Sequence, residues 1–573
     1  MPQIVQRIDE WRRRQDGLRI FFFLALALVL AGASYLRVAA IDRSLPYPQH
    51  VDEIFIADKA ANILRTGDFN PHYFIYPGLP TYLATAAMAC GFLDAANHLE
   101  LQSTAEIGTV TYPYVKHPRI VRPARLLFAL ISVLGLSIVA AVARQLGGGG
   151  PGGLAAMVLA PAWLCLSWLH FELSATYLNV NAVGCTLIWA LLWQVTSRLE
   201  DPSWRAKVFC PGILAGLAIA CKYNFGAVVL APLLAILWHG GQRRPEQAMA
   251  LGATTGAGFL LGSPYTLLDF HGFLDGLGKV VYMYNTPFFD HPESQTFLGH
   301  LWLNLKEVQA DLGAGGTLFV ILGAVWLARR DPRRAAILAI FPLLLLLQMS
   351  SLRSHFLRNL LPLLPLWTLL GALGMVAAAK VLATLAARRP RLARLGSPRL
   401  AGAALVALLA MAALFLPLGA PVRWLETPKR SRQDATDWLL KQAGPTRQLI
   451  AAEELALHPG PFEEAGIELR QIRARSLSTE AFLTELSRRP DALVLLPLFD
   501  AAHWDPPASA DGEKLLPGLE DLHAQLEKLR EFGSQKVSVY FDFPIHGDPH
   551  FVIGRSRRDA AEPAAIDAPP MLP

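Results

Sequence analysis

Residues 18–41 read LRIFFFLALALVLAGASYLRVAAI, and this stretch decides the kind of fold. The run exceeds the roughly 20 residues that cross a bilayer and the core of about 7 to 15 residues in a signal peptide. Three arginines at 12–14 precede it, and Ala31-Gly32-Ala33 resembles a cleavage site, but the apolar run continues beyond that point. We therefore predict a retained first transmembrane helix with a cytoplasmic N-terminus.

The composition of the 573-residue chain is typical of a membrane protein with a soluble part. Only 17% of the residues are charged and 53% are hydrophobic, whereas soluble domains have about 25% charged residues. Of the 52 basic and 46 acidic residues, 42 lie in the last 151 positions. This excludes a purely soluble enzyme, a disordered chain and a collagen-like chain. Membrane topology explains the net charge of +6 better than a nucleic-acid partner does.

Ten further apolar runs bring the prediction to about 11 transmembrane helices. They lie near 121–143, 153–171, 175–196, 207–222, 225–239, 247–265, 313–328, 335–350, 360–380 and 400–420. With the N-terminus inside, every arginine doublet between the runs, such as Arg243-Arg244, falls on the cytoplasmic side. Residues 79–96 would invert this order if they crossed the membrane. We therefore predict that they form a helix on the outer membrane surface.

This topology divides the chain into three parts. Residues 1–422 form an all-α polytopic membrane domain with external loops at 42–120 and 265–312. Residues 423–558 form a small periplasmic α/β domain, with predicted helices near 433–442, 479–488 and 519–532 and strands near 448–452, 467–472, 492–496, 537–543 and 551–554. The Ala- and Pro-rich tail at 559–573 is predicted to be disordered.

A glycine-rich segment at 147–153 falls on the inner side of this topology. Glycine-rich segments can bind phosphate when they join a strand to a helix, but no strand precedes this one. We predict a flexible inner turn and not a phosphate loop.

Two adjacent carboxylates, Asp52 and Glu53, open a short amphipathic helix in the first external loop. One interpretation is structural, because the helix dipole stabilises acidic residues at a helix N-terminus whatever their role. The functional interpretation is that one ionised, partly shielded carboxylate removes a proton from a hydroxyl nucleophile, while its neighbour orients it or a cation. The residues themselves leave both interpretations open.

Several further motifs occur in a fixed order along residues 15–420. They are Arg65-Thr66-Gly67-Asp68-Phe69-Asn70-Pro71, Tyr76-Pro77-Gly78-Leu79, Arg125-Leu126-Leu127, Lys222-Tyr223-Asn224 and His355-Phe356-Leu357-Arg358-Asn359. With Asp52-Glu53, this set resembles the lipid-carrier-dependent glycosyltransferases of the C-type membrane fold. It is similar to the protein O-mannosyltransferases (glycosyltransferase family 39) and to the aminoarabinose transferase of lipid A. That last branch carries Glu-Lys-Pro where this chain has Ile75-Tyr76-Pro77, which disfavours aminoarabinose transfer.

The resemblance implies a transferase in a bacterial-type inner membrane that moves a hexose or pentose from a polyprenyl-phosphate carrier to an acceptor at the outer face. The family's catalytic acid maps onto Asp52, with Glu53 as its partner. The acceptor stays open between a protein, a lipid and a polysaccharide, and a divalent metal stays open as a cofactor. The alternative is a non-catalytic transporter or envelope-assembly protein of related fold.

Cations near the outer surface are expected to stabilise the charge of the departing carrier phosphate. The candidates are Lys222, Arg125, Arg358, Arg353 and His355. A single arginine at a helix end can instead extend to the membrane interface without binding anything. Lys222 is the strongest candidate, because it lies where two apolar runs join and matches the family's Lys-Tyr-Asn motif.

A second set of residues is predicted to contact the acceptor or the sugar. Its members are Glu172, His170, His72 and Tyr76. The histidines and Glu172 could also be read as metal ligands. Their spacing is not that of a ligand set, so hydrogen-bonding loop residues are the favoured interpretation.

Overall fold

The structure is a computed structural model. It describes residues 2–43, 45–47, 50–107, 115–175, 177–201, 203–285, 292–387, 431–442, 448–452, 457–472, 488, 492–497, 526–532, 538–540, 543–546 and 551–556. The chain divides into two compact units. The first comprises 1–42, 55–109 and 119–427, and the second comprises 43–54, 110–118 and 428–573.

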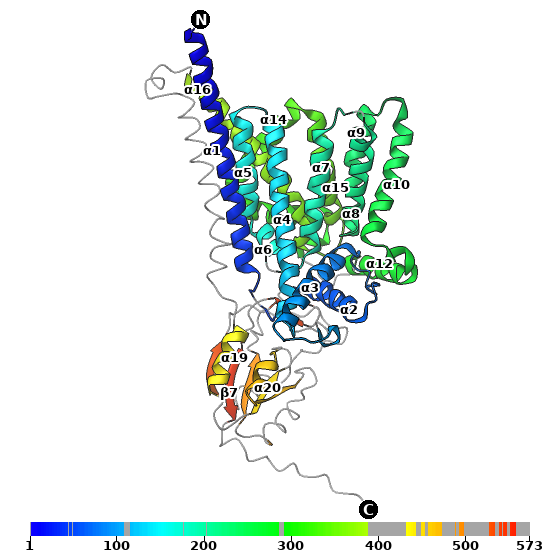
Figure 1. Cartoon of the computed structure of the whole chain (residues 1–573), viewed down its shortest axis with the longest axis vertical. Coiled ribbons are helices and arrows are strands. Elements are labelled where there is room, and N and C mark those ends of the chain that lie inside the picture. The colour runs from blue at the N-terminus through cyan, green and yellow to red at the C-terminus, as the bar shows by residue number, and fades with distance from the viewer. Residues whose placement is uncertain are drawn as a thin grey trace, which may run out of the picture. The chain divides into compact units, whose positions relative to one another are not determined.

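The first unit is built from helices, many of which run nearly parallel (Figure 1). In chain order the elements are α1 (Pro2–Ala40), α2 (Val51–Thr66), α3 (Leu79–Asn97), η1 (Thr104–Ile107), α4 (Pro118–Gly147), α5 (Pro151–Leu166), α6 (Trp168–Ala175), α7 (Val180–Ser197), η2 (Arg205–Phe209), α8 (Cys210–Ile219), η3 (Tyr223–Val229), α9 (Leu230–His239), η4 (Gly241–Arg243), α10 (Arg244–Gly262), α11 (Tyr265–Leu268), α12 (Phe270–Asn285), η6 (Pro292–Gln295), α13 (Phe297–Leu312), α14 (Ala314–Arg330), α15 (Pro332–Ser350), η7 (Leu357–Leu363) and α16 (Leu364–Ala387). Helix α2 begins in the second unit.

The polytopic all-α prediction is confirmed, but the predicted count of eleven spans is not reached within the described residues. Five helices there are long and apolar enough to cross a membrane, or up to seven if each of two bent pairs counts as one span. Every predicted run up to residue 380 contains helix, yet η3 and α9 together form only a shorter apolar helix, Tyr223–His239, which is not counted among the spans. The predicted run at 400–420 lies outside the described residues.

Close contacts between backbones hold part of the helical unit together. Helices α14 and α16 pack along one another, and Gly323 and Gly374 lie at their contact. A Cβ atom at Gly323 would lie 1.8 Å from Leu370 O, and one at Gly374 would lie 1.9 Å from Phe319 O. Small residues at such crossings let two membrane helices approach closely.

Two helices within residues 42–120 form where the sequence predicts them. Helix α2 carries Asp52 and Glu53 in its first turn and ends at Gly67, whose φ is +72° and whose N–H donates to Ile63 O over 2.9 Å. Helix α3 covers the predicted surface helix. It is not among the helices that qualify as spans by length and composition.

The second unit contains a mixed five-stranded sheet with the strand order β2-β1-β3-β7-β4. Its strands are β1 (Gln448–Ala452), β2 (Glu468–Ile472), β3 (Leu493–Pro497), β4 (Leu526–Phe532) and β7 (Phe551–Ser556); β5 (Ser538–Tyr540) and β6 (Phe543–His546) form a separate pair. Strand β1 is parallel to β2 and β3, whereas β7 is antiparallel to β3 and β4. Helices α19 (Ser431–Gln442) and α20 (Gly460–Glu464) contribute buried side chains to its apolar core, among them Leu439 and Phe462.

Residues 43–54 and 110–118 are part of this second unit. Gln433 Nε2 donates to Leu45 O over 2.9 Å, and the Tyr47 hydroxyl accepts from His458 N over 3.0 Å. The guanidinium carbon of Arg432 lies 4.9 Å from the centre of the Tyr47 ring. The C-terminal unit is therefore assembled from chain segments that are more than 380 residues apart.

One predicted element of this unit is wrong. The sequence predicts a helix over residues 519–532, but 526–532 form strand β4, paired with β7 through a register shift between Lys528 and Arg530. The predicted helix at 479–488 and the tail at 559–573 lie outside the described residues, apart from Arg488.

Candidate active site

Lys222 is a buried cation at the break between α8 and η3, with 4% of its surface exposed. Its Nζ donates to Asn181 Oδ1 over 2.9 Å and also to Asn359 Oδ1. Asn181 lies in the first turn of α7, and Asn359 lies in η7. Both amide oxygens are neutral hydrogen-bond acceptors, and together they orient the ammonium group.

A second layer of contacts fixes Asn359 in place. Its Nδ2 donates to the Tyr284 hydroxyl over 3.1 Å, and the Tyr284 ring meets the edge of Phe356 with 5.6 Å between ring centres. The guanidinium carbon of Arg358 lies 4.5 Å from the centre of the Phe356 ring. The motif at 355–359 therefore carries both Asn359, whose oxygen accepts a hydrogen bond from Lys222, and a second candidate cation, Arg358.

His355 is held by two neighbouring side chains. His300 Nδ1 is 2.9 Å from Leu352 O, and because a carbonyl only accepts, His300 carries its proton there. His355 Nδ1 is 3.0 Å from His300 Nε2, and its Nε2 lies 2.9 Å from Glu307 Oε2 without the geometry of a hydrogen bond. Through its contacts with these two residues of α13, His355 holds the 352–359 segment against that helix. That position favours a supporting role over direct phosphate binding.

The other predicted cations have different surroundings. Arg125 is 2% exposed, and its Nη1 donates to Ile41 O over 2.7 Å just after α1. Arg353 is exposed, while its backbone N–H donates to Tyr284 O over 3.2 Å. The structure thus brings the segment with Arg353, Arg358 and Asn359 to the Lys222 site through Tyr284.

Asp52 and Glu53 lie in the second unit and are fully buried, with 1% and 0% of their surfaces exposed. Asp52 N donates to His50 Nδ1 over 3.0 Å, and Glu53 N donates to His50 O over 3.1 Å. Because His50 Nδ1 accepts from a backbone N–H, it carries no proton, and its 3.5 Å approach to Asp52 Oδ2 is not an ion pair. The imidazole therefore orders the start of α2 without neutralising Asp52.

His72 belongs to a polar cluster that ties the loop after α2 to the α11–α12 junction. Its Nε2 is 2.8 Å from Asp68 Oδ2, and Asn70 Nδ2 donates to Asp269 Oδ2 over 2.8 Å. The backbone N–H of Asn70, followed by His72, lowers the pKa of Asp68 below its usual value. The Asn70 side chain, followed by the N–H of Gly272, lowers the pKa of Asp269. The cluster therefore favours ionised carboxylates.

Tyr76 lies in an aromatic group of the same loop. Its ring meets Tyr73 with 6.5 Å between centres, and Tyr73 stacks on Phe55 at 5.1 Å. Phe55 is 38% exposed. An exposed aromatic face of this kind can pack on a sugar ring.

His170 contacts a buried arginine, Arg37, that is not among the predicted site residues. Arg37, 1% exposed, donates from Nη2 to His170 Nδ1 over 2.9 Å and from Nε to Ser174 Oγ over 2.9 Å. A guanidinium only donates, so His170 carries its proton on Nε2. Glu172 lies on the same short helix and is half-buried. An arginine inside an otherwise apolar span was the sequence signal that could have identified Arg37.

Possible metal ligands do not gather into one site within the described residues. Among the residues that the structure describes, no three His, Cys, Asp or Glu side chains are grouped as metal ligands.

Comparison with known sequences and structures gives the following similarities. Residues 121–266 match the family described as dolichyl-phosphate-mannose-protein mannosyltransferase. Asn181 and Lys222 both lie in this matched stretch, and the predicted resemblance is confirmed there. The match supports a membrane glycosyltransferase that uses a lipid-linked donor. No curated protein sequence matches significantly.

Three solved structures are similar at low sequence identity. ArnT of Cupriavidus metallidurans in the apo state is 15% identical, with a TM-score of 0.45, and the match covers 96% of this chain and 99% of that one. The same protein bound to undecaprenyl phosphate is 14% identical, with a TM-score of 0.46 and coverage of 94% and 98%. The oligosaccharyltransferase of Archaeoglobus fulgidus, tethered to an acceptor peptide, is 12% identical, with a TM-score of 0.42 and coverage of 83% and 69%.

Proposed function

We propose that this chain transfers a sugar from a polyprenyl-phosphate carrier to an acceptor at the outer face of the inner membrane. The observation that carries the proposal is the buried ammonium of Lys222, oriented by Asn181 and Asn359. Keeping a cation out of water is costly unless an anion or a set of dipoles stabilises it. A phosphate that gains charge as the sugar departs is a fitting partner for such a group.

The proposed reaction is a single displacement. The acceptor oxygen attacks the anomeric carbon, the bond from that carbon to the phosphate oxygen breaks, and the carrier leaves as polyprenyl phosphate. Asp52 takes the proton of the acceptor hydroxyl, and Glu53 orients Asp52 or the acceptor. Lys222, with Arg125 and Arg358, stabilises the negative charge on the leaving phosphate.

The remaining candidates have lesser roles in this proposal. Tyr76 and its aromatic neighbours offer a face to the sugar, and the Asp68–His72 pair offers hydrogen bonds to it. His170 and Glu172 lie on α6, where Arg37 fixes the helix, and they are proposed to contact the acceptor. Arg353 and His355 support the segment that carries Arg358.

The test is transfer from radiolabelled polyprenyl-phosphate sugars by the purified full-length chain, with an envelope extract as the acceptor. Wild type is compared with Asp52→Asn and with a control variant, Asp58→Asn. Asp58 lies on the same helix as Asp52, and its carboxylate pairs with Lys59. We expect label transfer by wild type and Asp58→Asn but not by Asp52→Asn. The identity of the labelled product names the acceptor.

Two results would contradict the proposal. Normal transfer by Asp52→Asn at normal expression would remove its role as general base. Binding of carriers without transfer from any of them would favour a non-catalytic transporter or envelope-assembly protein.

A further inference from the structure

The glycine-rich turn between α4 and α5 lies beside three basic side chains from three different helices. Arg144 of α4 donates from Nη1 to Gly148 O over 2.6 Å and from Nη2 to Gly149 O over 3.5 Å. A Cβ atom at Gly148 would lie 3.0 Å from Arg330 Nη2, and one at Gly152 would lie 3.3 Å from Lys380 Nζ. Arg144 thus shapes the turn, while Arg330 and Lys380 bring two further charges to it.

The cationic groups of Arg330 and Lys380 both lie near one indole ring, that of Trp326. The guanidinium carbon of Arg330 is 4.8 Å from the centre of the Trp326 ring, and Lys380 Nζ is 5.7 Å from the same centre. Within the described parts of the chain, neither side chain has a carboxylate within 4.0 Å. The nearest acid in sequence, Asp331, pairs with Arg334 instead. Two like charges around one ring repel each other, and an anion between them would relieve that repulsion.

The turn itself leaves room for such an anion. Gly149 and Gly150 are exposed, and no atom lies within 4 Å of the position that a side chain would take on either residue. Gly148 has a φ of +88°, a backbone conformation that a larger residue rarely adopts. Successive glycines in a turn of this kind can form a concave surface that accepts an anion.

The surface next to the turn is apolar and faces outward from the bundle. Leu318, Leu322, Trp326 and Arg330 follow one another at intervals of four along α14, so they form one inclined row on the helix. Leu318 is 60% exposed and Leu322 is 40% exposed. The row offers an apolar track to a lipid chain and ends at the cation that would bind its headgroup.

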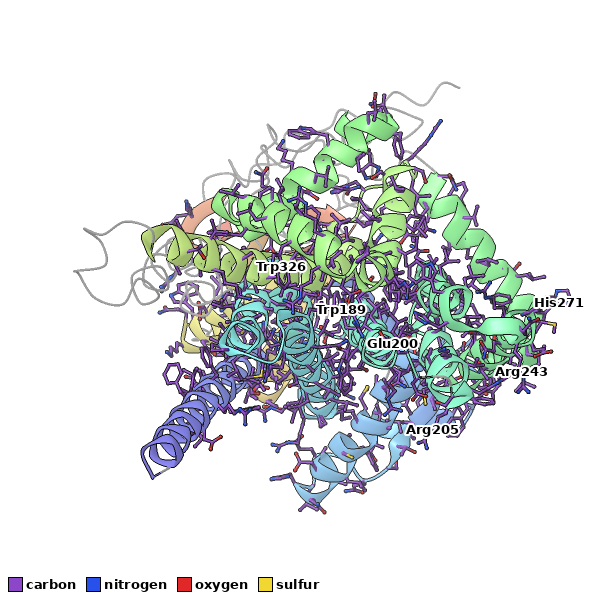
Figure 2. All side chains as sticks on the ribbon, turned by 90° about the horizontal axis from the view of Figure 1, so that it is seen from above. Trp189, Glu200, Arg205, Arg243, His271 and Trp326 are labelled. Atoms are coloured by element: carbon purple, nitrogen blue, oxygen red, sulfur yellow. The ribbon has the colours of Figure 1, made fainter. Side chains whose placement is uncertain are left out.

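We propose that the turn at 148–150, together with Arg330 and Lys380, binds the phosphate of an anionic membrane lipid in the cytoplasmic leaflet. Basic pockets between membrane helices on this side are suited to such headgroups. The site is separate from the transfer reaction, and its test does not depend on activity. Figure 2 shows Trp326 labelled among the helices and Arg243 well separated from it, so Arg243 provides a control cation.

The experiment measures binding of fluorescent phosphatidylglycerol to the full-length protein in detergent. Unlabelled phosphatidylglycerol, phosphatidylcholine and inorganic phosphate serve as competitors. We expect competition by unlabelled phosphatidylglycerol only, with roughly fivefold weaker binding for each of Arg330→Gln and Lys380→Gln. Arg243 is exposed and lies outside the cluster, so Arg243→Gln should bind like wild type.

A pair of near-isosteric variants guards against an effect of misfolding. Gly149→Asp places a carboxylate beside the cations in open space, and Gly149→Asn places a neutral side chain of the same size there. Weak binding by the Asp variant with retained binding by the Asn variant would support the proposal. Equal binding by wild type, Gly149→Asp and the two cation variants would overturn it, as would equal competition by phosphatidylcholine. Competition by millimolar inorganic phosphate as strong as that by the lipid would also overturn it, because the site would then take free phosphate.

Discussion

Asn359 can be changed to Asp with almost no change of shape, and this change tests the electrostatic role of Lys222. The new carboxylate would still accept from Lys222 Nζ but would cancel its charge. We expect Asn359→Asp to raise the KM for the lipid-linked donor by at least about tenfold, equivalent to about 1.4 kcal/mol of lost carrier binding. Steady-state transfer kinetics with a varied donor concentration measure this effect.

The matched control is a second buried asparagine outside the Lys222 site. Asn304 is 1% exposed and donates to Ser350 Oγ over 3.0 Å. Asn304→Asp is expected to lower thermal stability while leaving the KM for the donor within twofold of wild type. An unchanged KM in Asn359→Asp would show that the charge of Lys222 does not bind the carrier.

The hydrogen bond from Asn70 to Asp269 is expected to make the stability of residues 67–78 depend on pH. The pKa of Asp269 is lowered mainly by the hydrogen bond from Asn70 Nδ2. A lowered carboxyl pKa stabilises the folded loop above the ordinary value of about 3.9, and this stability is lost as the pH falls through the lowered value. We expect Asn70→Ala to shift the onset of acid-induced loss of amide protection in residues 67–78 to higher pH. Hydrogen exchange between pH 7 and pH 3 measures it.

Asn97→Ala removes an exposed asparagine at the end of α3 and serves as the control for this experiment. It is expected to keep the acid onset of wild type. The same onset in Asn70→Ala and wild type would show that this hydrogen bond does not set the titration of Asp269.

At the scale of elements, the N-terminus of helix α6 is stabilised by a residue of α13. Asp311 Oδ2 accepts from Ser167 Oγ over 2.5 Å, and its Oδ1 accepts from Leu169 N over 3.0 Å, so Asp311 caps α6 from outside. Loss of such a cap costs about 1 kcal/mol. We expect Asp311→Ala to lower the thermal midpoint by a few degrees, with a smaller loss for Asp311→Asn, which keeps one acceptor oxygen. Thermal unfolding in detergent with Ser167→Ala as a third variant tests the assignment, and an unchanged midpoint in Asp311→Ala would refute it.

The helices of the first unit could be predicted from the sequence, whereas strand β4 of the second unit could not. Apolar runs predicted the helices, because burial in a membrane depends on local composition. Residues 519–532 have good helix formers, yet pairing with β7 outweighs that preference over 526–532, since strand formation depends on distant partners. Lys222 could be predicted from its place between two apolar runs. Its oxygen ligands could not, because Asn181 and Asn359 are 41 and 137 residues away.

For the whole molecule, the predicted topology can be tested with two single cysteines in a chain whose exposed Cys90 is replaced by serine. Gln102 is exposed in the predicted first external loop, and Glu200 is exposed in a predicted inner turn and labelled in Figure 2. We expect a membrane-impermeant maleimide to label Gln102→Cys in intact spheroplasts. Glu200→Cys should be labelled only after permeabilisation, and the reverse pattern would overturn the orientation.

The second unit combines early and late segments of the chain, and this has a consequence for the order in which it can form during synthesis. Residues 43–54 are made early, but the segments they pack with, around Gln433 and His458, are made only after every predicted membrane span. Leu45 and Tyr47, which lie a few residues before the carboxylate pair, therefore acquire these partners only after residues 433 and 458 have been synthesised. A chain without residues 428–573 would be expected to lose both contacts, together with the sheet that belongs to the same compact unit as residues 43–54.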